Sequence, residues 1–527
     1  MLCSIEIWHI LRKKIILFII MKSIVKAVFT LTLFSMIDRL LGFVFKIYLS
    51  RELGATQIGI YQVALSVFFV LLTLTTSGIP LIVSKMTARF AIAKDKKSEH
   101  GTVTAALIVG LALSLVVCSI FLLFSDAIGK MFATKQSMTL LLFLLPGVLF
   151  SGIYAAFRGN LWGHQRYTAV SLIELLEQVV RIAVCVILFA LGFEKLKVTA
   201  VSMSVACGVT ALACAICYFV LKGKMANPKP VLLPLIKQST PITLIRASSS
   251  VVNSLVAIAV PFLLVRTGMS VAESLAVYGA SVGMAFPLLY IPITVVGSLA
   301  YVLIPTLSTA VAKNDTASVR KQIEQAISFS ICIAALFVPI FRALGQEIGL
   351  FVYDNELSGK FLSSCAWLLI PVSVENITSS MMNSLDLEKS SFVNYAIGAA
   401  ALFGIMFAFM GSFKIEIMII GFAVSWTLSS VLDIIRIRKK TGIRLSFIMP
   451  LIKSVLLVFP CDILVRSLYS LIDFMPKIFS IGISSLVGLA FSMTLGLVFG
   501  IFDFSVFFSE KKKSQKKVAK KRKKRYT

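Results

Sequence analysis

The sequence predicts an all-α protein that crosses a membrane many times, and three observations lead to this prediction. Of its 527 residues, 58% are hydrophobic and only 14% are charged, against roughly 25% charged residues in a soluble domain. The mean hydropathy is +0.94. The apolar residues also form segments of about 20 residues, which is the length of a transmembrane helix, and not the short alternating strands of a membrane barrel. These observations exclude a soluble enzyme, a disordered chain and a β-barrel.

About fourteen apolar segments are long enough to cross a bilayer. We expect transmembrane helices at residues 24–49, 56–80, 102–124, 138–158, 169–192, 197–221, 241–265, 275–300, 324–350, 361–384, 391–411, 415–435, 447–466 and 478–502. Residues 1–21 form an N-terminal extension. Its basic and apolar stretches are typical of a short signal anchor, but Met21 is an equally good start of the chain.

The distribution of lysine and arginine predicts the orientation, because cytoplasmic segments of membrane proteins carry the excess of positive charge. Eleven of the 52 basic residues lie in the C-terminal tail at 505–527, and most of the others fall on the same predicted side. We therefore expect a plasma-membrane protein with both termini in the cytoplasm and the tail bound to anionic lipids. The tail has almost no aromatic residues that could stack on bases, so nucleic acid is not an expected partner.

Proline spacing predicts an internal duplication. Ile-Pro pairs at Pro80 and Pro305 are expected to close spans 2 and 8, and Leu-x-Pro triplets at Pro146 and Pro371 to open the helical parts of spans 4 and 10. The prolines of each pair are 225 positions apart, although four independent helix kinks are the alternative. Two parallel six-helix lobes with two appended helices would then follow. The expected boundaries are 22–222 for the N-lobe, 223–440 for the C-lobe and 441–504 for the last two helices.

Ionisable residues at mid-depth in a membrane cost roughly 2.5–3.5 kcal/mol each and therefore mark a paired partner or a wet cavity. The deep groups are Asp38 and Arg39 in the first span, Glu174, Glu177 and Arg181 in the fifth, and Glu375 in the tenth. Lys46, Arg246, Asp433 and Lys453 lie near span ends, where snorkelling accounts for them.

The fifth span is the most informative, because Glu174, Glu177, Gln178 and Arg181 have the spacing of one helical stripe. The stripe fits either a Glu177–Arg181 ion pair in a seam between helices or the wall of a cavity, and we favour the cavity. Glycines at Gly279 and Gly283 form a GxxxG pattern that predicts close helix packing.

Arginine in such a cavity suits a phosphorylated cargo, because its planar fork binds phosphate oxygens bidentately and keeps its charge when desolvated. Arg39, Arg181 and Arg246, together with Lys46, are therefore the candidate substrate-binding residues. Asp38, Glu174, Glu177 and Glu375 are candidates for charge balance or for coupling to H+ or Na+. No GxxxxGK[ST], HExxH or GxSxG motif occurs, so we expect no catalytic residue, metal or cofactor.

Four blocks of sequence carry a family resemblance: RLLGFVFKIYLSRELGATQIGIYQ at 39–62, TTSGIPLIVSKMTA at 75–88, FRGNLWGHQRYTAVSLIELLEQVVRI at 157–182 and PLLYIPITVVGSLAYVLIPTLSTA at 287–310. Over roughly residues 22–505 the chain resembles the stage V sporulation protein B group of polysaccharide-biosynthesis flippases. Their superfamily also holds the lipid II flippases and the multidrug and toxin extruders. Lys46 stands where this resemblance leads us to expect an arginine. The positive charge is kept, but lysine cannot bind a phosphate bidentately as a guanidinium does.

The resemblance implies two lobes around an alternately accessible cavity, in a cell-wall or sporulation role. It also implies a flippase, not an enzyme, which moves a polyprenyl-diphosphate-linked saccharide or peptidoglycan precursor from the inner to the outer leaflet. A cation-coupled multidrug extruder on the same fold is the alternative, and it would prefer an acidic cavity. A membrane glycosyltransferase or polymerase is less favoured, because it would need a large outer loop with carboxylates, and the outer loops here have about a dozen residues or fewer.

Overall fold

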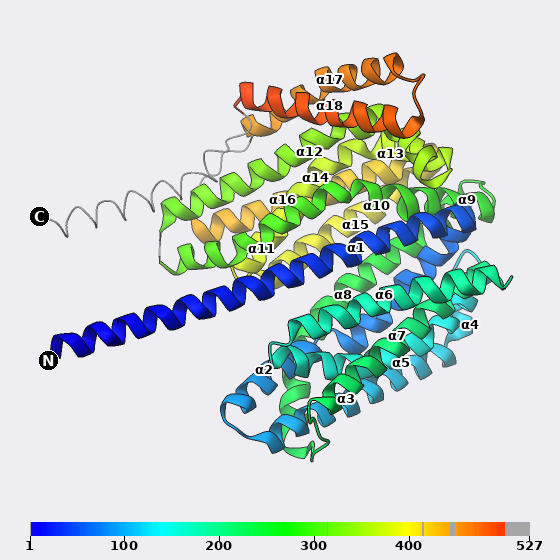
Figure 1. Ribbon diagram of the computed structural model, residues 1–527. Helices are drawn as coiled ribbons and strands as arrows, with labels where there is room; N and C mark the ends of the chain where they lie inside the picture. Colours follow the sequence, from blue (N-terminus) through cyan, green and yellow to red (C-terminus); the bar gives the residue numbers. More distant parts are fainter. Residues whose placement is uncertain (1, 314, 414–415, 443–447, 501–527) are drawn as a thin grey trace, which may run out of the picture. The chain divides into compact units, whose positions relative to one another are not determined.

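In a computed structural model, the chain is described over residues 2–313, 315–413, 416–442 and 448–500, with only the backbone described for residues 2–32, 300–302, 305 and 410–413. All regular structure in these ranges is helical (Figure 1). The predicted all-α membrane fold is therefore confirmed. The basic tail at 505–527 lies outside the described residues.

The chain divides into two units after Gly279. The first unit contains α1 (Leu2–Thr76), α2 (Ile79–Ile92), α3 (Lys96–Leu123), α4 (Ser125–Gly129), α5 (Lys135–Gly163), α6 (Tyr167–Ala190), α7 (Lys195–Val220), α8 (Lys229–Arg266) and α9 (Val271–Tyr278). The expected lobe boundary at 222–223 falls inside this unit, because α8 packs against α1 and α3.

A short π-helix, η1 (Gly279–Ala285), leads into the second unit. That unit contains α10 (Phe286–Leu289), α11 (Ile291–Ala312), α12 (Thr316–Tyr353), α13 (Glu356–Cys365), η2 (Ala366–Leu368), α14 (Leu369–Ser384), α15 (Glu388–Phe413), α16 (Glu416–Thr441), α17 (Ile448–Leu471) and α18 (Lys477–Val498).

Twelve helical segments in the described ranges are long and apolar enough to cross a membrane. The first of them, Leu33–Ile92, holds two of the predicted spans, because Gly54 breaks α1 with φ 71° and ψ 170°. Glycine tolerates this left-handed φ, since it has no Cβ. Helix α6 is not among the twelve although it has 24 residues, because any 18-residue stretch of it contains three charged residues, Glu174, Glu177 and Arg181. When the second span within Leu33–Ile92 and helix α6 are added to the twelve, the number of spans agrees with the predicted number of about fourteen.

The prolines follow the predicted pattern only in part. Pro80 lies in the first turn of α2, and Pro371 lies in the first turn of α14. Pro146, however, is inside α5, and Pro305 is inside α11. The predictions that Pro146 opens a helix and that Pro305 closes one are therefore wrong. A proline removes one backbone hydrogen bond, and a helix can continue through that site as a kink when its neighbours pack against it.

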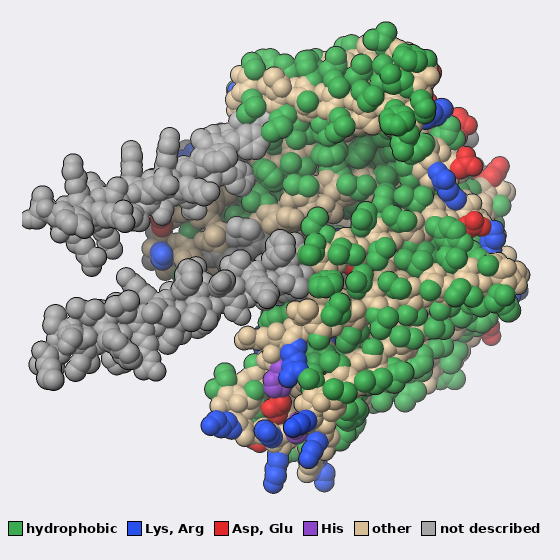
Figure 2. Space-filling view, in the orientation of Figure 1, with side chains coloured by type: hydrophobic (Ala, Val, Ile, Leu, Met, Phe, Trp, Pro, Cys, Tyr) green, Lys and Arg blue, Asp and Glu red, His purple; other side chains and the backbone are tan. Residues whose placement is uncertain are grey.

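Helices of the first unit approach one another closely at glycines. A Cβ on Gly279 would collide with the carbonyl oxygen of Ala55, and a Cβ on Gly59 would collide with that of Leu275. The close packing predicted for Gly279 is therefore confirmed, with α1 as the partner helix. Away from these contacts, Figure 2 shows large apolar surfaces on the outer faces of the helices. Leu123, for example, is 80% exposed. Such faces are compatible with lipid rather than water.

Candidate functional site

Arg181, the last residue of the predicted stripe, lies near the middle of α6. Its Nη2 donates to Oε1 of Gln178 at 2.6 Å, and its Nη1 donates to Sδ of Met203 on α7 at 3.5 Å. The guanidinium lies 5.3 Å from the ring centroid of Phe45 on α1, a cation–π distance. Three helices of the first unit therefore hold this side chain in place.

Two of the predicted acidic residues lie around this arginine. Asp38 of α1 and Glu177 of α6 both interact electrostatically with Arg181, and so does Tyr61 of α1. No ion pair within 4.0 Å joins Arg181 to either acid in the described part of the chain. The close Glu177–Arg181 pair that was one interpretation of the sequence is therefore not formed. We call Asp38, Phe45, Glu177, Gln178 and Arg181 the Arg181 cluster.

The Arg181 cluster contains hydrogen-bond donors without acceptors. Nε of Arg181 and Nε2 of Gln178 are both buried and have no hydrogen-bond partner among the described residues. Most buried donors in proteins are paired, because an unpaired one loses its hydration without compensation. An oxygen-rich anion that reached these nitrogens would satisfy them, and a small rearrangement would be needed to admit it.

Glu174 lies apart from this cluster although it is only one turn from Glu177. It forms a 2.6 Å ion pair with Nη2 of Arg158 and accepts a 3.1 Å hydrogen bond from the hydroxyl of Tyr154. The guanidinium of Arg158 also stacks over Trp162, 4.2 Å from the ring centroid. Sequence reasoning did not single out Arg158, because nothing local indicates that α5 supplies the partner of Glu174.

The other predicted cations have fewer side-chain contacts than Arg181. Arg39 is exposed on α1 and interacts electrostatically with Asp38. Lys46 is half-buried, and no ion pair or hydrogen bond of its side chain is found among the described residues. Arg246 is exposed on α8, and its Nη1 donates to the carbonyl of Ser77 at 3.1 Å. Within the described ranges, no hydrogen bond or ion pair connects Arg246 to the Arg181 cluster.

The second unit has its own buried polar group. Glu375 of α14 interacts electrostatically with Asp433 of α16. Asp433 accepts a 2.7 Å hydrogen bond on Oδ1 from Nδ2 of Asn394 on α15, and it is only 2% exposed. The interpretation of Asp433 as a snorkelling residue near a span end is therefore wrong, because its carboxylate points at a neighbouring helix. A carboxylate pair with an amide is suited to holding a proton or a small cation.

The fold is shared with solved membrane transporters. An inward-facing multidrug resistance transporter of the MATE family, in the MOP superfamily, has a TM-score of 0.65 and 18% identity over 79% of this chain and 98% of its own. The lipid II flippase MurJ in an inward closed conformation has a TM-score of 0.68 and 13% identity over 89% of this chain and 98% of its own. The chain is thus a multi-pass helical membrane protein with the fold of a transporter.

The sequence comparisons are more specific. The family model described as polysaccharide biosynthesis protein matches residues 24–311, and the chain belongs to this family. Stage V sporulation protein B of Bacillus subtilis (strain 168) is 26% identical over 401 residues, which cover 73% of this chain and 77% of that protein. The family resemblance expected from the four sequence blocks is therefore confirmed.

Proposed function

We propose that this chain is a flippase that moves a polyprenyl-diphosphate-linked saccharide or peptidoglycan precursor across the plasma membrane by alternating access. The observation that carries this proposal is Arg181, a cation in the middle of a membrane helix with no close ion pair in the described residues and with a buried donor unused. A diphosphate would supply both the charge and the acceptors that this side chain lacks. The similarity to stage V sporulation protein B and to the lipid II flippase MurJ supports this substrate class.

Arg39 and Lys46 belong to the same proposed route, because both are cations on α1, the helix that contributes Asp38 and Phe45 to the Arg181 cluster. Arg246 lies on α8, and we retain it as a further head-group contact on the strength of its charge and exposure. The charges of Asp38 and Glu177 would balance the cations of the route between substrate passages, while Glu174 balances Arg158.

We place ion coupling in the second unit. Glu375 and Asp433 interact inside a helix bundle, and binding of H+ or Na+ there would relieve the repulsion between two carboxylates. The positive charges of the inner segments favour an orientation with both termini in the cytoplasm and with the basic tail against anionic lipids. Movement would then run from the inner to the outer leaflet.

The proposal is tested with the full chain in liposomes and a fluorescently labelled polyprenyl-diphosphate saccharide, read by loss of fluorescence when a membrane-impermeant quencher is added. We expect Arg181→Ala to lower the transport rate at least tenfold and Arg181→Lys to restore part of it, because lysine keeps the charge but not the fork. Lys197→Ala is the matched control, since Lys197 pairs with Glu194 at the exposed start of α7.

Two negative results would have different meanings. If the wild-type protein moves no lipid-linked saccharide, the substrate class is wrong. If Arg39→Ala and Arg181→Ala both fold, insert and transport at the wild-type rate, the cationic route is wrong.

Cation-coupled drug export is the second candidate, because the fold is shared with a multidrug transporter and the second unit holds an acidic pair. Efflux of a cationic dye that is lost in Glu375→Gln would favour it.

A further inference from the structure

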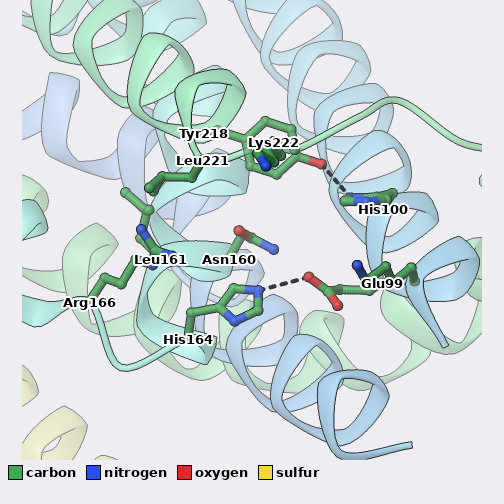
Figure 3. Close-up of a pocket in the computed structure, with 11 residues that line it drawn as sticks. Glu99, His100, Asn160, Leu161, His164, Arg166, Tyr218, Leu221 and Lys222 are labelled. Carbon is green, nitrogen blue, oxygen red and sulfur yellow. Dashed lines mark hydrogen bonds and ion pairs between the residues drawn. The ribbon is translucent and has the colours of Figure 1, made fainter. Parts of the chain in front are cut away.

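A pocket of about 250 Å³ lies in the first unit where the ends of α3, α5, α6 and α7 meet (Figure 3). The first turn of α3 meets two loops there, the one between α5 and α6 and the one after α7. Each of these three segments contributes a cation to the lining, namely Lys96, Arg166 and Lys222. In Figure 2 the corresponding end of the first unit shows a group of lysine and arginine side chains around histidine and acid.

The charges in this pocket do not cancel. In the part of the chain that the structure describes, no ion pair or hydrogen bond is found for the side chains of Lys96, Arg166 or Lys222. The acid in the lining is Glu99, which is 8% exposed and lies 2.7 Å, through Oε1, from Nε2 of His164. The carboxylate is therefore already engaged by a side chain of the pocket, and the three cations are left with an excess of positive charge.

A second acid close by is also engaged. Asp95 precedes α3 and accepts a hydrogen bond from the backbone N–H of Ser98 at 3.1 Å. The hydrogen bonds from Ser98 hold the pKa of the Asp95 carboxyl below its usual range. Asp95 thus stays ionised as the cap of α3, and it does not line the pocket.

The pocket has a fixed polar wall. The hydroxyl of Tyr218, a residue that is 2% exposed, donates to the carbonyl of Lys224 at 2.8 Å and lies 3.1 Å from Nδ1 of His100. These contacts tie the loop that carries Lys222 to α3. Lys222 itself has φ 64°, and Gln165, the neighbour of Arg166, has φ 58°. Both are the left-handed residues that end α5 and α7, and the backbone N–H groups of Arg166 and Gly223 close these helix ends by donating to the carbonyls of Leu161 and Tyr218.

We propose that this pocket is a binding site for a small phosphate-bearing anion. Lysine binds phosphate as a point charge and arginine as a bidentate fork, and both kinds of donor are present. The volume is below that of pockets for drug-sized ligands, which begin at roughly 300 Å³, so it suits a phosphate or diphosphate group and little more. The anion can be the head group of a membrane lipid or a soluble compound, and the chemistry of recognition is the same.

This site is separate from the proposed route of the substrate. Arg166 precedes the first residue of α6, and Arg181 lies fifteen residues further on, which is about 22 Å along a helix. An anion bound here would join the start of α3 to two loops of the same unit, and it would stabilise the fold by its binding free energy. The inference therefore stands even if the transported substrate differs from the one proposed above.

The test uses the full chain in nanodiscs of phosphatidylcholine, with inorganic pyrophosphate as the probe and constant ionic strength. We expect a saturable rise of several degrees in the thermal midpoint of the wild-type protein. Arg166→Ala and Lys222→Ala should each weaken pyrophosphate binding at least fivefold. Lys97→Ala should not, because Lys97 neighbours Lys96 on α3 but does not line the pocket.

A variant that is expected to bind pyrophosphate more tightly distinguishes a change in binding from a general loss of stability. Glu99→Gln removes the negative charge of the pocket and keeps an acceptor for His164, so it should bind pyrophosphate severalfold more tightly than the wild type. Absence of a saturable shift in the wild type, an unchanged shift in both Arg166→Ala and Lys222→Ala, or weaker binding in Glu99→Gln would each overturn the proposal.

The source of the anion is distinguished by repeating the titration in nanodiscs with phosphatidylglycerol. If lipid head groups occupy the pocket, the wild type starts at a higher midpoint there than Lys222→Ala, and pyrophosphate adds little. If the ligand is soluble, the pyrophosphate shift is the same in both lipids. Either result supports a phosphate site.

Discussion

Nη2 of Arg181 lies 2.6 Å from Oε1 of Gln178, one helical turn earlier on α6. Gln178 is 7% exposed, so this neutral side chain, and not an acid, fixes the direction of the guanidinium. A neutral partner leaves Arg181 without a contact ion pair, so its charge can still attract an anion although Asp38 and Glu177 lie near it. An acid in the same place would orient the arginine equally well but would cancel its charge.

This relationship predicts the effect of two substitutions at one position. Gln178→Ala should lower the transport of the labelled lipid-linked saccharide about two- to fivefold, because Arg181 loses its orientation but keeps its charge. Gln178→Glu should lower it further, because the new carboxylate neutralises Arg181, while the thermal midpoint should fall less than in Gln178→Ala. Transport that is higher in Gln178→Glu than in Gln178→Ala would contradict the role given to the charge.

The buried contact between Asn394 and Asp433 predicts an interaction energy within the second unit. A hydrogen bond to a charged group contributes about 1.5–3 kcal/mol, and removal of one partner leaves the other buried without it. We expect Asn394→Ala and Asp433→Ala each to lower the free energy of unfolding, measured by denaturant titration in detergent. The loss in the double variant should be smaller than the sum of the two single losses. Strictly additive losses would show that the 2.7 Å contact contributes nothing to stability.

The contact between α1 and α9 predicts a strong effect of a single methyl group. A Cβ on Gly59 would collide with the backbone of Leu275, which cannot move aside as a flexible side chain can. Gly59→Ala should therefore cost about 1–3 kcal/mol of stability, the usual range for overpacking. Gly482→Ala is the matched control, because Gly482 lies inside α18 with no heavy atom within 4 Å of the point where a Cβ would lie, and alanine favours a helix over glycine. Equal thermal midpoints of the two variants would argue against close packing at Gly59.

Much of the fold and part of the candidate site follow from sequence reasoning. The apolar segments predict the helices, since a span needs only a sufficient run of apolar residues. The cost of a charge at mid-depth is enough to single out Asp38, Glu177 and Arg181, which the structure brings together across α1 and α6. The GxxxG pattern likewise predicts close packing at Gly279, because small residues allow backbones to approach.

The partners of these residues could not be predicted in the same way. Glu174 pairs with Arg158 of α5, and Asp433 binds Asn394 of α15. The pocket at the start of α3 combines Lys96 of that helix with cations from two separate loops, Arg166 and Lys222, which are 56 positions apart in the chain. Hydropathy and periodicity are properties of neighbouring residues, so the sequence alone is sufficient to place a charge within a helix. Which side chain faces that charge depends on how helices distant in sequence pack, and the three-dimensional structure is needed to supply that information.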